Sequence, residues 1–155
     1  MRNVAASDRS TYRRTDLFVV YASNVINISM AILFGVRILG ISLVEKALGI
    51  VVLFLGFSLG YVAYRNKTNK RNRWEVHLLL PFLFFSIVEL ILDYILVLDF
   101  RSTAIVGPYL LLYYTSLWML IGYGFRFEKK WGFVTLATYF LNMSLSLCQY
   151  FILGQ

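Results

Sequence analysis

The sequence predicts an all-α membrane protein in which five transmembrane helices form a bundle, with the N-terminus in the cytoplasm and the C-terminus outside. Three observations support this prediction. The 155 residues are 59% hydrophobic, which exceeds the apolar content usual for a soluble protein. These apolar residues gather in long runs that match the thickness of a bilayer core. The basic residues lie mainly in the short connections between the runs.

The chain divides into a polar tail, residues 1–16, and one membrane domain, residues 17–153. Within this domain we expect transmembrane helices at 17–36, 47–64, 76–98, 105–123 and 132–153. Each range is long enough to span a bilayer at 1.5 Å per residue. The first is too long for the apolar part of a cleaved signal peptide. The connections leave no room for a further domain, so we expect the function to lie within the bilayer or at its surface.

The distribution of Lys and Arg predicts the orientation. If all five ranges span, successive connections lie on alternate sides of the membrane. Twelve basic residues then share the side of the N-terminus, and three lie on the other side, namely Arg37, Lys46 and Arg101. Because cytoplasmic loops are rich in Lys and Arg, this bias predicts a cytoplasmic N-terminus and supports a count of five spans. We expect a prokaryotic plasma membrane, since no organelle address is present.

The composition also limits the chemistry. A single cysteine, Cys148, and a single histidine, His77, leave this chain without the ligands for a disulfide, a thiolate cluster or a multi-histidine metal centre. We therefore expect no cofactor and no metal. Nucleic acid is not an expected partner, because the excess of basic residues is explained by positive-inside topology and anionic lipid. The sequence has no phosphate loop or nucleophile elbow, so an enzyme is not the favoured reading.

One connection carries the strongest run of positive charge. It holds Arg65, Lys67, Lys70, Arg71 and Arg73. A run of this kind beside a membrane helix is typical of contact with anionic lipid head groups. Docking of a cytosolic partner is the alternative.

The candidate site centres on Glu89 and Asp93 in the third predicted span. A carboxylate in hydrocarbon is costly, so it usually faces the bundle interior or a water-filled cavity. The two residues are four apart and share a helical face. A proton relay or cation site is the functional interpretation. The structural alternative is that Arg37 pairs with Asp93 while Glu89 bonds to a neighbouring helix.

Polar residues at helical spacing in other spans are candidates to meet this face. We expect Asn24, Asn27, Tyr113 and Asn142 to line a route past Glu89, although buried amides also serve as contacts between membrane helices. In the second span Gly49, Gly56 and Gly60 share one face. Small residues let helices approach closely, so this face predicts packing inside the bundle or, alternatively, the seam of a homo-oligomer.

Three functions follow as hypotheses. The first is a small transporter or a proton- or cation-linked channel that uses Glu89. The second is a non-catalytic subunit or assembly factor that holds a larger membrane complex. The third and least favoured is an intramembrane enzyme that modifies lipids.

Overall fold

The structure is a computed structural model of the chain. It describes residues 2–98 and 103–153, with side chains for residues 12–98 and 103–152. Arg101, which contributed to the predicted orientation, lies outside these ranges.

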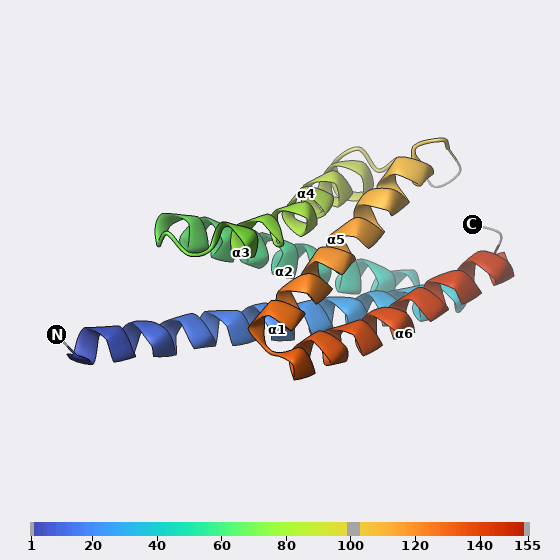
Figure 1. The fold of residues 1–155 in the computed structure, drawn as a ribbon. Coiled ribbons are helices and arrows are strands. Elements are labelled where there is room, and N and C mark those ends of the chain that lie inside the picture. The colour runs from blue at the N-terminus through green and yellow to red at the C-terminus, as the bar shows by residue number, and fades with distance from the viewer. Residues whose placement is uncertain (1, 99–102, 154–155) are drawn as a thin grey trace.

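The described residues form helices joined by short turns. In chain order the helices are α1 (Arg2–Ile38), α2 (Ser42–Thr68), α3 (Arg73–His77), α4 (Leu80–Glu89), the π-helix η1 (Leu90–Ile95), α5 (Val106–Phe127) and α6 (Lys129–Leu153). Figure 1 shows α1, α4 and α6 running in one direction and α2 and α5 running in the other. We call the end of the bundle that holds residues 39–41 the α1–α2 end, and the end that holds residues 69–72 the α2–α3 end.

Four helical segments are long and apolar enough to cross a membrane. They are Tyr12–Ile38, Ser42–Thr68, Arg73–Ile95 and Lys129–Ile152. The prediction of an all-α fold is confirmed for the part of the chain that is described, and these four segments are consistent with the predicted membrane bundle. The count of five spans and the orientation stay predictions. Helix α5 is not among the four, although its 22 residues would extend about 33 Å. Its tyrosines and glycines lower its mean hydropathy.

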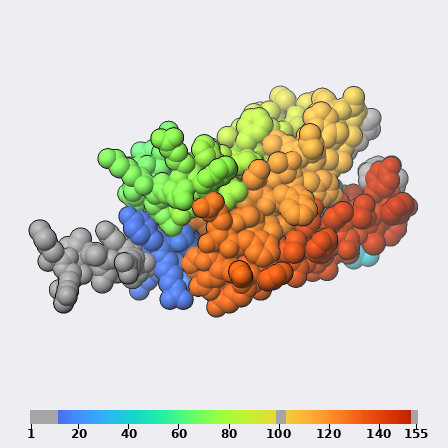
Figure 2. Space-filling view, in the orientation of Figure 1, coloured from blue at the N-terminus to red at the C-terminus, as the bar shows by residue number. Residues whose placement is uncertain are grey.

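The polar residues that lower the hydropathy of α5 point into the protein. Tyr113 and Tyr123 are only 2% and 3% exposed, and α5 packs against both α4 and α6. Figure 2 shows α5 in orange between the yellow-green of α4 and the red of α6. Helix α5 is thus an integral part of the bundle.

The surface of the bundle is apolar and parts of its interior are polar. Ser86, Thr135 and Asn142 are fully buried, whereas Phe54 and Phe151 are 71% and 81% exposed. In water this arrangement would leave large apolar side chains hydrated. In a bilayer the exposed rings face acyl chains, and the buried polar groups bond to one another.

The third predicted span, 76–98, overlaps the apolar segment Arg73–Ile95, but this segment is not one continuous α-helix. Helix α3 ends at His77, and α4 begins at Leu80 with a proline in its first turn. Pro81 has no N–H to continue a helical ladder from α3. Beyond Glu89 the helix widens into η1, in which the amide of Leu96 donates to the carbonyl of Ile91 over 2.9 Å.

The three glycines of α2 all lie against the third span of the same chain. A Cβ added at Gly49 would clash with the hydroxyl of Tyr94, and one added at Gly60 would lie 2.6 Å from Leu83. At Gly56 the added atom would lie 2.8 Å from Cβ of Ser86. This face is therefore covered by α4 and η1 and is not open to a second copy.

Gly56→Ala is expected to destabilise the protein by about 1–3 kcal/mol, because the methyl group overpacks the contact between α2 and α4. Gly35→Ala is the matched control, since nothing lies within 4 Å of a Cβ added there. It is expected to be neutral or stabilising by up to about 1 kcal/mol. Thermal unfolding in detergent measures both, and equal midpoints for the two variants would contradict this packing.

Two helices end in the same hydrogen-bonded turn with different residues at its left-handed position. After α1 this position is Gly40, with φ 72°, and after α2 it is Lys70, with φ 52°. The bonds match, since Ile41 bonds to Val36 and Arg71 bonds to Asn66 across five residues. This is the pattern of a Schellman cap, which favours glycine.

Lys70→Gly should therefore raise the free energy of unfolding by about 1 kcal/mol, because glycine adopts positive φ without steric cost. Gly40→Lys should lower it by a similar amount. The measurement is the midpoint of thermal unfolding. A lower midpoint for Lys70→Gly would show that the lysine side chain stabilises the turn by more than its backbone strain costs.

Candidate functional site

Two adjoining cavities lie near the α1–α2 end of the bundle, and we call them together the Glu89 cavity. The first has a volume of about 450 Å³ and the second about 500 Å³. Leu33, Arg37 and Glu89 line both. Each volume falls within the range of small-molecule sites.

Glu89 stands where the two cavities meet. It is the last residue of α4 and immediately precedes the π-helix. Its Oε2 accepts a hydrogen bond from the hydroxyl of Tyr109 on α5, which agrees with the expectation that Glu89 bonds to a neighbouring helix. It also borders open space, as the functional interpretation requires. π-helical turns are rare and often occur at functional sites.

The second cavity collects charged residues from α1, α2, α4 and η1. Asp93 lines it together with Glu89, so the two predicted carboxylates do share one face. Arg37 from α1 lines it as well and bonds to Glu45 at the start of α2, with 2.8 Å between Nε and Oε1. Lys46 completes the set. We call this charged second cavity the mouth of the Glu89 cavity.

The first cavity has aromatic walls and an acceptor amide. Its rings are those of Phe34, Tyr109, Tyr113, Tyr114 and Tyr150. The side chain of Gln149 also lines it and is only 5% exposed. Among the described residues, Oε1 of Gln149 has no hydrogen-bond partner. A buried acceptor of this kind is costly unless a donor reaches it.

Two of the predicted site residues lie away from this cavity. Asn24 and Asn27 face α6, where the amide of Asn24 donates to Thr135 over 3.1 Å and the hydroxyl of Thr138 donates back over 2.9 Å. The amide of Asn27 also donates to Thr138, over 3.1 Å. These asparagines therefore join α1 to α6 as packing contacts, which is the alternative that the sequence left open.

Asn142 and Tyr113 form a link between the buried polar contacts and the cavity. The amide of Asn142 on α6 donates to the hydroxyl of Tyr113 on α5 over 2.7 Å. Both side chains are almost fully buried, and Tyr113 lines the aromatic part of the cavity. Of the six predicted residues, Glu89, Asp93 and Tyr113 thus line the cavity and Asn142 holds one of them in place.

A second polar cluster closes the α2–α3 end. Both terminal nitrogens of Arg71 bind the carboxylate of Asp16, with 2.9 Å between Nη1 and Oδ1 and 3.0 Å between Nη2 and Oδ2. Its Nε lies 2.7 Å from Glu75, and the hydroxyl of Tyr123 donates to Asp16 over 2.6 Å. The side chains of Arg71 and Asp16 are only 12% and 14% exposed. This cluster ties α1, α3 and α5 together through the connection that follows α2.

The charge of Arg71 is secured by its partners. Burial by itself lowers the pKa of the guanidinium, and this is the largest single effect. The hydrogen bond and the charges of Asp16, together with Glu75, outweigh it and raise the pKa above its ordinary value. The guanidinium therefore stays protonated at any physiological pH.

Sequence reasoning missed the role of Asp16, Glu75 and Tyr123 in this cluster. A signal was present, because Asp16 stands directly before the first apolar run and an acid at that boundary can pair with a basic connection. The structure also separates Arg71 from the other four basic residues of the predicted head-group contact. Arg65, Lys67, Lys70 and Arg73 are exposed, whereas Arg71 is occupied by protein carboxylates.

Comparison of this chain with protein-family models, with curated proteins and with solved structures found no match. Among the described residues, no group of three or more His, Cys, Asp and Glu could hold a metal ion. The fold and the site together define a helical membrane protein with a carboxylate-containing cavity at one end of its bundle.

Proposed function

We propose that this protein is a small transporter that binds an organic cation in the Glu89 cavity and carries it across a prokaryotic plasma membrane. In this proposal the N-terminus is cytoplasmic, α5 is the fifth span, and the cavity opens to the outside. The observation that carries the proposal is the position of the Glu89 carboxylate beside aromatic walls and the acceptor of Gln149.

The chemistry of the walls favours an ammonium ligand. Aromatic faces attract a cation by about 0.5–2 kcal/mol each, and Glu89 supplies a negative charge to which the ligand can donate a hydrogen bond. Oε1 of Gln149 could accept a second N–H from the same ligand. The second cavity carries the three carboxylates of Glu45, Glu89 and Asp93 against the two positive charges of Arg37 and Lys46, so its formal charge favours a cation over an anion.

The same carboxylate can serve both directions of a transport cycle. A carboxylate within the bilayer is favoured when it is neutralised by a cation or by a proton. After the cation is released at one side, Glu89 takes up a proton there. The neutral carboxyl group then allows the empty cavity to reorient toward the other side of the membrane. The cluster of Asp16 and Arg71 would then act as the closed gate at the α2–α3 end, because it joins three elements of the bundle at that end.

The test is uptake by proteoliposomes of phenethylammonium, a primary ammonium ion with one ring, under an imposed proton gradient. We expect uptake that depends on the gradient and none of the neutral analogue 2-phenylethanol above passive leak. A panel of primary, secondary and quaternary ammonium ions extends the assay. Uptake no greater than in protein-free liposomes across that panel would refute the proposal.

A non-catalytic membrane subunit is the second candidate, and one observation favours it. Asn24 and Asn27 are engaged in contacts between α1 and α6, so the polar route expected past Glu89 is shorter than the sequence predicts. Gentle purification of the tagged chain from its native membrane, followed by mass spectrometry with stoichiometry, separates the two. A stoichiometric larger partner would support the subunit, and recovery alone or as a homo-oligomer would favour transport.

A further inference from the structure

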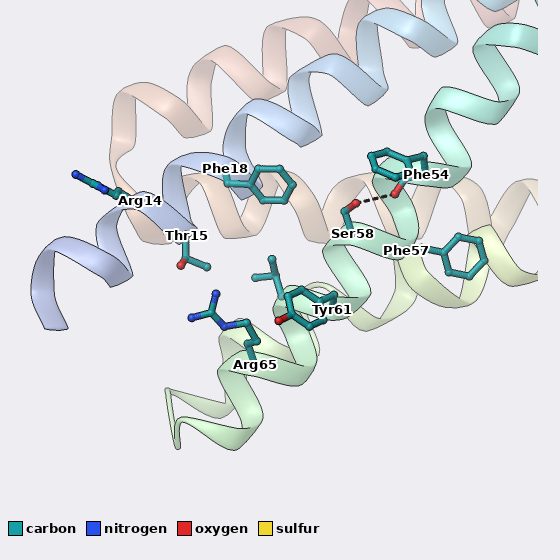
Figure 3. A pocket seen from close by; sticks show the side chains of 9 residues that line it. Arg14, Thr15, Phe18, Phe54, Phe57, Ser58, Tyr61 and Arg65 are labelled. Carbon is teal, nitrogen blue, oxygen red and sulfur yellow. Dashed lines mark hydrogen bonds between the residues drawn. The ribbon is translucent and has the colours of Figure 1, made fainter.

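A groove with a distinct chemistry lies between α1 and α2, far from Glu89. It has a volume of about 660 Å³, and its lining includes Arg14 and Phe18 from α1 and Phe54, Tyr61 and Arg65 from α2. Figure 3 shows both arginines at the same end of this groove, with the guanidinium of Arg65 turned toward α1 and that of Arg14 extended outward. The aromatic rings occupy the rest.

The groove is positively charged at one end and apolar along its length. None of its lining residues is acidic. Within the described side chains neither Arg14 nor Arg65 forms an ion pair, in contrast to Arg71. Phe54 and Tyr61 are 71% and 62% exposed, so their rings present apolar surface to whatever fills the groove.

The dimensions match one leaflet of a bilayer. Phe54 and Arg65 are eleven positions apart on one helix, which places them about 16 Å apart along its axis. Half of a typical hydrocarbon core is about 15 Å thick. A ligand with its negative charge at Arg65 would therefore extend an acyl chain past Phe54 to about the middle of the membrane.

We propose that this groove binds an anionic phospholipid from the leaflet that adjoins the α2–α3 end. The phosphate is held by Arg14 and Arg65, and one acyl chain lies along Phe18 and Phe54. Charge complementarity and length both select this occupant, since a free phosphate would leave the aromatic walls uncovered. The site is independent of transport through the Glu89 cavity and would exist equally in a non-catalytic subunit.

The test is native mass spectrometry of the full chain released from nanodiscs that contain phosphatidylglycerol and phosphatidylcholine with identical acyl chains. The wild type is expected to retain phosphatidylglycerol in preference to phosphatidylcholine. The double variant Arg14→Gln, Arg65→Gln should bind phosphatidylglycerol about 30-fold more weakly, given about fivefold per basic residue. Phe54→Ser should weaken retention as well, through loss of an acyl contact.

The matched control is Lys67→Gln, Lys129→Gln, which removes the same net charge outside the groove and is expected to keep the preference. An equal loss in both double variants would show diffuse surface charge and overturn the proposal. So would equal retention of the two lipids by the wild type. Competition by glycerol 3-phosphate as strong as that by phosphatidylglycerol would assign the arginines to a free phosphate compound instead.

Discussion

Replacing Glu89 by glutamine is expected to weaken binding of phenethylammonium about 10- to 100-fold and to abolish its uptake, with little change in the fold. The replacement removes a hydrogen bond between two charged groups, which is worth about 1.5–3 kcal/mol. The carbonyl of glutamine still accepts the hydroxyl of Tyr109 that now bonds to Glu89. Ligand-induced shifts of the thermal midpoint measure binding, and proteoliposome uptake measures flux.

Glu128→Gln is the matched control, because it removes a carboxylate at the α2–α3 end that pairs with Arg13 and Lys130 on the surface. It should leave both binding and uptake within about twofold of the wild type, since surface ion pairs contribute little. Gln149→Leu should weaken ammonium binding, because it removes the acceptor Oε1. It should leave the passive leak of 2-phenylethanol unchanged. Wild-type flux in Glu89→Gln would rule out the assigned role of this carboxylate.

Arg71→Met is expected to be the most destabilising single change in the basic connection, at about 3 kcal/mol or more. The partly buried carboxylates of Asp16 and Glu75, whose side chains are 14% and 23% exposed, both pair with this guanidinium, so its removal leaves two acids close together without their shared base. Asp16→Asn should cost less, because Arg71 keeps Glu75. The midpoint and the enthalpy of thermal unfolding in detergent measure both.

A double variant sharpens this test. The double variant Asp16→Asn, Arg71→Met should be more stable than Arg71→Met alone, since it removes one of the two carboxylates that lack a basic partner in the single variant. Arg73→Met is the control for charge, because this exposed residue lies in the same connection outside the cluster. If Arg73→Met proves as destabilising as Arg71→Met, the loss reflects the general positive charge of the connection and not the ion pairs at Asp16.

The site was only partly predictable. Glu89 and Asp93 stood out because ionisable residues within apolar runs are rare and costly, and their four-residue spacing fixed a common face. The spacing of Asn24 and Asn27 does not distinguish a cavity wall from a contact between helices, because either role places the two side chains on one face of α1. The pairing of α1 with α6, which are more than 90 positions apart in the chain, decides between them.

The hydropathy pattern determined by itself that this is a helical membrane protein, because apolar runs of bilayer length have few other stable structures. Each apolar run falls within a helical segment, but α1 begins at Arg2, well before the predicted start at residue 17, and the third run is divided among α3, α4 and η1. Only the tertiary structure decided which polar groups meet, since that depends on the rotation and partner of each helix. It assigned the glycines of α2 to the contact with α4, drew Arg71 into a cluster with Asp16, and opened a cavity at Glu89 where the π-helix begins.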